Sequence, residues 1–105
     1  MITIHNKLVR DNIPEIINNS GRKANYHVLD NDVEFEKALM AKLVEEANEL
    51  YIAETEEERI EELADIITVL FCLMKNRDVI KTVAKAKMSE KGSFTKRYFL
   101  ESVEE

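Results

Sequence analysis

The sequence predicts an all-α protein, a bundle of about four helices that is completed by oligomerisation. Its 105 residues suit a single domain, 1–105, and include only 2 glycines and 1 proline, a composition typical of helix-rich globules. Helix start and stop signals recur along the chain. Some of the expected helices also carry apolar residues on more than one face, which a chain of this length cannot cover by itself.

Capping boxes mark the starts of three helices. In this motif an Asn or Thr is followed three residues later by Glu, and the two residues satisfy free backbone N–H groups. The pairs are Asn12–Glu15, Asn31–Glu34 and Thr55–Glu58. They predict helices over residues 13–19, about 32–53 and about 56–75. Asp78 predicts the start of a fourth helix, and the glycines at 21 and 92 fit the ends of the first and the last.

Two short segments interrupt this helical pattern. KANYHVL, at residues 23–29, and TKRYFLES, at residues 95–102, carry β-prone residues. The first is too short to form a stable helix. A short β pairing between residues near 25–29 and 97–101 is therefore an alternative that the sequence leaves open.

Charge, hydropathy and cysteine content exclude several classes of protein. The net charge of −6 argues against a nucleic-acid polymer as partner. No apolar run approaches the ~20 residues that span a bilayer, and the N-terminus lacks the layout of a signal peptide. The single cysteine, Cys72, cannot form an internal disulfide, so we expect a cytoplasmic location and a buried structural thiol.

The helix expected over 32–53 has an unusual apolar stripe. At helical spacing one arc holds Phe35, Leu39, Leu43, Leu50 and Ala53. Glu46 projects into the middle of this arc, with Lys42 and Glu49 along its edge and Glu45 a little beyond. A buried lone charge is costly unless it is neutralised or paired. Lys42 can pair with one carboxylate but not with three, so something else must compensate.

The helix expected over 56–75 repeats this pattern. Glu62 and Asp65 stand at the upstream end of one apolar face, and residues 66–74 are apolar nearly all round. The preceding helix has a second apolar patch on its reverse side. Burial by another copy of the chain is the simplest way to cover these surfaces, so we expect a homodimer or a homotetramer.

The acidic residues on these two helices suit a metal site. Residues i and i+3 share a helix face, so Glu46 with Glu49 and Glu62 with Asp65 each form a converging pair. Antiparallel packing would unite the four carboxylates in an all-oxygen site, which Mg²⁺ prefers and which Mn²⁺ also accepts. Surface or salt-bridged acids are the alternative. A di-iron site is disfavoured because neither helix contains histidine.

Three stretches of the chain resemble one protein family. EEANE, a gap of 12 residues and ELAD are similar to the E-E-x-x-E … E-x-x-D signature of the all-α NTP pyrophosphohydrolases, the MazG-like superfamily. KLVRDNIPEII at 7–17 and KAKMSEKGSF at 85–94 resemble the ends of its phosphoribosyl-ATP pyrophosphohydrolase-like subgroup. Together they cover most of the chain in the expected order.

The resemblance implies Mg²⁺-dependent hydrolysis between the α and β phosphates of a nucleoside triphosphate or a related nucleotide, in a site built across helices of a dimer or tetramer. The implied metal ligands are Glu46, Glu49, Glu62 and Asp65. Glu45 would be a further ligand or orient the attacking water, and Lys42 would contact phosphate. The histidine-biosynthesis enzyme of the subgroup follows its Ala-Asp pair with Tyr-His, whereas this chain continues ADIITVL, so phosphoribosyl-ATP is not carried over and a house-cleaning role fits as well.

Several basic residues are candidates for binding substrate phosphate. They are Lys7 and Arg10 near the N-terminus and Lys87, Lys91, Lys96 and Arg97 around the Gly92 turn. Each is also compatible with a solvated surface position. Two other functions stay open: a helical module that binds a partner through its apolar faces, and a metal or nucleotide sensor that turns nothing over.

Overall fold

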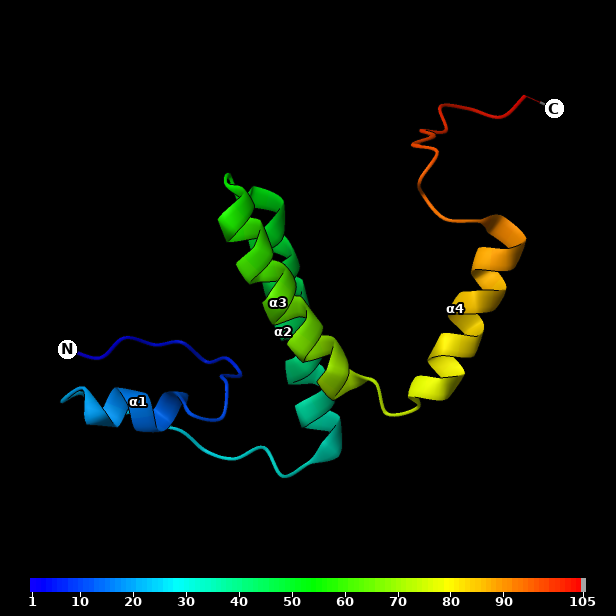
Figure 1. The fold of residues 1–105 in the computed structure, drawn as a ribbon. Helices are drawn as coiled ribbons and strands as arrows, with labels where there is room; N and C mark the ends of the chain where they lie inside the picture. Colours follow the sequence, from blue (N-terminus) through cyan, green and yellow to red (C-terminus); the bar gives the residue numbers. More distant parts are fainter. Residues whose placement is uncertain (105) are drawn as a thin grey trace. The chain divides into compact units, whose positions relative to one another are not determined.

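The computed structural model describes residues 1–104 and contains four α-helices there. They are α1 (Ile13–Asn19), α2 (Asp32–Ile52), α3 (Glu56–Leu73) and α4 (Arg77–Lys91), as Figure 1 shows. The described residues contain no β-strand, so the all-α prediction is confirmed. The chain divides into two units, Met1–Leu73 and the residues from Met74 onward, and each is considered by itself.

Helices α2 and α3 form an antiparallel hairpin in the first unit (Figure 1). Only residues 53–55 connect them, and so short a connection makes the two helices antiparallel neighbours. The predicted caps are present at both starts. The Asn31 side-chain oxygen accepts hydrogen bonds from the Val33 and Glu34 N–H groups, and the Thr55 hydroxyl accepts one from the Glu58 N–H.

Two of the predicted caps are wrong. Asn12 has helical backbone angles and its side chain makes no capping hydrogen bond, so Pro14 in the first turn is the start signal that holds for α1. Asp78 lies inside α4, where its carbonyl accepts a hydrogen bond from the Thr82 hydroxyl. The predicted ends hold, because Gly21 and Gly92 have φ values of 84° and 83°, which L-residues rarely adopt.

The β pairing between residues 25–29 and 97–101 is absent, since neither segment is a strand in the part of the chain that the structure describes. The two segments belong to different units. The physical reason is that a lone two-stranded pair, with no sheet face packed on a core, is marginal in water. High β propensity in a short segment therefore does not suffice to form a strand.

The hairpin has a very small interior. Within residues 1–104 the buried side chains are Leu39 and Val69, at 4% and 7% exposure, and Glu46 at 4%. Large apolar side chains on α2 and α3 stay exposed, among them Met40, Val44, Tyr51, Ile60 and Ile67. The prediction of a buried thiol is wrong for the single chain, because Cys72, on α3, is exposed. None of the helices in residues 1–104 combines the length and hydropathy that a bilayer span requires.

Candidate metal centre

Five carboxylates gather where α2 faces α3. Glu45, Glu46 and Glu49 come from α2, and each offers an oxygen within 4.8 Å of the other two. Glu46, Glu62 and Asp65 form a second group with the same spacing, and this group spans both helices. Glu46 belongs to both groups and is the most buried of the five. The structure therefore brings together the four residues that the sequence predicts as metal ligands, with Glu45 beside them.

Three cationic side chains contact this acidic cluster. The Lys42 Nζ lies 3.3 Å from Glu46 Oε1 and 3.4 Å from Glu45 Oε2. The Lys7 Nζ lies 3.2 Å from Glu45 Oε1. The Arg10 Nη2 donates to Asp65 Oδ1 at 2.7 Å. Lys7 and Arg10, which the sequence predicts as phosphate-binding residues, are thus placed at the predicted metal site, although both are held there by carboxylates.

Thr68 is a site residue that the sequence did not indicate. Its hydroxyl accepts a second hydrogen bond from Arg10 Nη2 at 3.3 Å and donates one to the Ala64 carbonyl at 3.0 Å. Thr68 follows Asp65 by three residues and so shares its helix face. That spacing is the signal that could have identified it, once Asp65 was singled out.

The crowding of carboxylates changes their pKa values in opposite directions. The hydrogen bond with the Glu46 carboxyl, the loss of hydration and the hydrogen bond and charge of Glu49 together raise the pKa of Glu62 to about 8. Loss of hydration works against ionisation of Glu45 as well, but the hydrogen bond from Lys7 and the charge of Lys42 outweigh it and lower the Glu45 pKa. At neutral pH, Glu62 therefore retains a proton while Glu45 is ionised.

Two of the carboxylate oxygens are buried and unsatisfied. Among the described residues, Glu46 Oε2 and Glu62 Oε2 have no hydrogen-bond partner apart from the proton that Glu62 itself retains. Buried polar atoms in native proteins are nearly always satisfied, so an orphaned pair on facing helices indicates a ligand. Once Glu62 loses its proton, five carboxylates with three cations leave an excess of two negative charges. One divalent cation with a preference for oxygen fits both the orphaned atoms and this charge.

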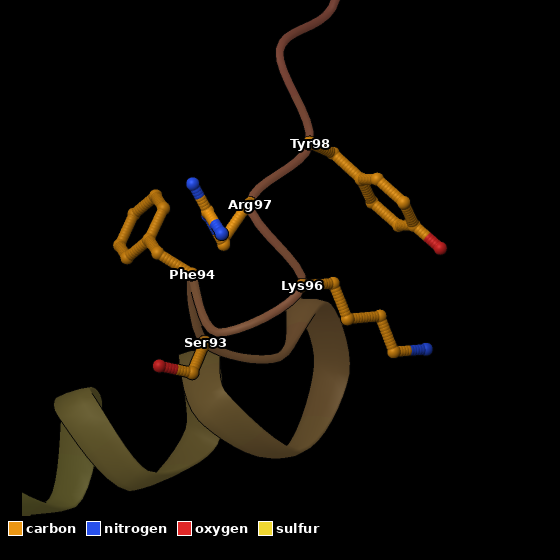
Figure 2. Close-up of a pocket in the computed structure, with 5 residues that line it drawn as sticks. All are labelled: Ser93, Phe94, Lys96, Arg97 and Tyr98. Carbon is orange, nitrogen blue, oxygen red and sulfur yellow. The ribbon is translucent and has the colours of Figure 1, made fainter.

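The other predicted phosphate-binding residues lie in the second unit, where Lys87, Lys91 and Arg97 are exposed. Arg97 lines a pocket of about 180 Å³ together with Ser93, Phe94, Lys96 and Tyr98 (Figure 2). Figure 2 shows Lys96 and Tyr98 projecting to the opposite side from Phe94 and Arg97. The pocket is smaller than the ~300–1,000 Å³ typical of small-molecule sites. The acidic cluster is therefore the better candidate for a functional site.

Comparison with models of protein families, with curated proteins and with solved structures finds no match to this chain. Membership of the MazG-like superfamily, which the motifs predict, stays a prediction. The functional interpretation therefore depends on the residues of the acidic cluster and on their geometry.

Glu62 makes stability depend on pH in a definite direction. In the unfolded chain it ionises near 4.5, whereas in the folded chain it holds its proton up to about 8. The folded state then binds more protons than the unfolded state between these values, so the free energy of unfolding falls as the pH rises through this range. We expect the melting temperature in chelator to decrease from pH 5 to pH 8, and Glu62→Gln to flatten that decrease.

Glu61→Gln, which changes the neighbouring exposed glutamate, is the matched control and should keep the wild-type profile. A wild-type melting temperature that stays level or rises between pH 5 and pH 8 would contradict the assignment of a retained proton to Glu62.

Proposed function

We propose that this protein is a Mg²⁺-dependent nucleotide pyrophosphohydrolase, which cleaves the α–β phosphoanhydride to a nucleoside monophosphate and pyrophosphate. One observation carries the proposal: carboxylates from two antiparallel helices converge, and a buried oxygen on each helix has no partner among the described residues. The residues involved are those of the E-E-x-x-E … E-x-x-D motif. The motif and the geometry thus support the same site.

Glu46, Glu49, Glu62 and Asp65 would hold the divalent ion, and Mn²⁺ has the same preference for oxygen ligands. When bound, Mg²⁺ supplies positive charge that neutralises the carboxylates and polarises phosphoryl oxygens. Loss of the Glu62 proton would accompany binding, because a coordinating carboxylate must be ionised. The four proposed ligands come from α2 and α3 of one chain, to which helices of another copy could be added.

Glu45 is the residue best suited to act on the attacking water. Its pKa is lowered, so it is ionised and can orient the water by accepting a hydrogen bond from it. The water oxygen forms a bond to one of the two bridged phosphorus atoms, the bridging P–O bond breaks, and the water proton passes to the Glu45 carboxylate. Lys42, whose side chain is 19% exposed, lies beside Glu45 and Glu46. Its positive charge would offset the charge that develops on the phosphoryl oxygens.

The substrate class follows from the resemblance and from one departure. Because the chain reads ADIITVL where the histidine-biosynthesis enzyme has Ala-Asp-Tyr-His, we assign nucleoside triphosphates and related nucleotides as substrates and a house-cleaning role, rather than phosphoribosyl-ATP. Such a role requires a site that recognises the phosphates more strictly than the base. A cluster of carboxylates, lysines and an arginine, with no aromatic side chain among its members, is consistent with that.

Pyrophosphate release from a panel of nucleotides with Mg²⁺ tests the proposal. Asp65→Asn and Glu49→Gln each remove a charged ligand and should reduce the rate by about 100-fold or more. Glu101→Gln, which changes an exposed glutamate in the second unit, should leave the rate unchanged. Equal rates in wild type, Asp65→Asn and Glu49→Gln would remove the mechanism. Stabilisation by Mg²⁺ without turnover of any nucleotide would indicate a sensor instead.

We also propose that the exposed apolar faces of α2 and α3 are covered by further copies of the chain, in a homodimer or homotetramer. Val44 is 60%, Ile60 58% and Ile67 52% exposed in the single chain. Several large apolar side chains left exposed on two packed helices are typical of an interface. The same faces are the observation that favours the second candidate function, a helical module that binds a different protein.

Sedimentation velocity separates these two functions. The mass derived from the sedimentation of the wild type should be two or four times the 12.2 kDa of one chain. Ile67→Lys should shift it toward the monomer, because a charge at the interface costs association energy. Val103→Lys, at a residue 71% exposed in the second unit, is the control. A folded monomer at micromolar concentration would contradict self-association and favour the partner-binding module.

A further inference from the structure

The segment that precedes α1 connects the two helices of the acidic cluster through its side chains. Residues 1–12 form no helix. Lys7 contacts Glu45 on α2, and Arg10 contacts Asp65 and Thr68 on α3. We call residues 7–10 the N-terminal strap. Its two cations contact opposite sides of the acidic cluster, Lys7 on α2 and Arg10 on α3.

The backbone around the strap positions these two side chains. Asn6 has a φ of 46°, a left-handed conformation that Asn tolerates better than most residues. This turn comes directly before Lys7. At the other end the Arg10 carbonyl accepts a hydrogen bond from the Ile13 N–H at 3.1 Å. The strap is thus fixed to α1 at one end, while its charged side chains stay accessible, with Lys7 42% and Arg10 56% exposed.

The strap occupies atoms that a divalent ion or its water would need. Asp65 Oδ1 is taken by Arg10, and the two oxygens of Glu45 are taken by Lys7 and Lys42. An ammonium or guanidinium group on a carboxylate oxygen repels a divalent ion that binds the same carboxylate, so the two compete for it. Partly exposed ion pairs are weak and exchange readily, so these contacts can be given up when a stronger competitor arrives.

We propose that the N-terminal strap is an internal counter-ion that is transferred from the carboxylates to the substrate. Without ligand, Lys7 and Arg10 neutralise Glu45 and Asp65. When a nucleotide enters with its divalent ion, the ion replaces the strap on the carboxylates, and the two cations bind phosphate oxygens, for which the arginine fork is well suited. This inference rests on the proposed function and adds a role for the strap in selecting the metal–nucleotide complex over the free metal.

The transfer predicts effects of opposite sign on two ligands. Removing the strap cations removes a competitor for the carboxylates, so Mg²⁺ alone should bind more tightly. It also removes phosphate contacts, so the nucleotide complex should bind more weakly. A strap that only supports the fold would weaken both, because loss of the folded site reduces binding of any ligand.

Calorimetric titration of Mg²⁺ without nucleotide, and of a non-hydrolysable nucleoside triphosphate with Mg²⁺, measures both effects. For Lys7→Gln with Arg10→Gln we expect the Kd for Mg²⁺ to fall about threefold to tenfold and the Kd for the nucleotide complex to rise by a similar factor. Lys23→Gln with Lys81→Gln removes the same charge from exposed positions and should change neither. Arg10→Lys, which keeps the charge, should lie near wild type for Mg²⁺.

The outcomes separate the strap from the proposed function. If the double variant is unstable, Lys7→Gln and Arg10→Gln made singly should show the same two directions at smaller size. If wild type binds Mg²⁺ and the variant binds it equally well or more weakly, the counter-ion role of the strap is wrong. The pyrophosphohydrolase proposal would then stay intact. Absence of Mg²⁺ binding in wild type and all variants would overturn both.

Discussion

The repulsion among carboxylates between α2 and α3 is the constraint on which the rest of this structure depends, because the groups around them must reduce it. Glu46 is only 4% exposed and has acidic neighbours on its own helix and on the facing one. A charge in such a position destabilises the fold unless it is paired or neutralised. Lys42 pairs with one of its oxygens, a proton stays on Glu62, and the N-terminal strap neutralises Glu45 and Asp65. Once the Glu62 proton is lost, none of these satisfies the second oxygen of Glu46.

This constraint links the fold to the proposed chemistry. A purely apolar seam between α2 and α3 would give a more stable hairpin, as replacement of buried ionic groups by apolar residues often does. In this chain, acidic residues instead occupy the centre of the contact between α2 and α3, the only helix–helix contact within the first unit. Such local costs are typical of functional sites, where the ligand supplies the missing stabilisation. The exposed apolar faces on the same two helices have a parallel explanation, since they too require a partner to be covered.

The sequence predicted the parts of this arrangement that depend on local spacing. The capping residues Asn31 and Thr55 fixed the starts of α2 and α3, and the i, i+3 spacing placed Glu62 beside Asp65. The contact of Arg10 with Asp65 joins residues 55 positions apart, and no periodic pattern reports it. Asn12 precedes α1 as predicted but its side chain does not cap the helix, and Asp78 lies inside α4, which Asn76 precedes. Residues 25–29 had β propensity without a sheet to join.

Coordinates of the protein crystallised with Mn²⁺ would test the core of this account most directly, because the ion shares the oxygen preference of Mg²⁺ and is located by its anomalous scattering. We predict an anomalous peak bounded by carboxylate oxygens of Glu46, Glu49, Glu62 and Asp65, with Glu46 Oε2 and Glu62 Oε2 no longer unsatisfied. A map in which Mn²⁺ lies elsewhere, or in which these four side chains point apart toward solvent in every copy, would contradict it.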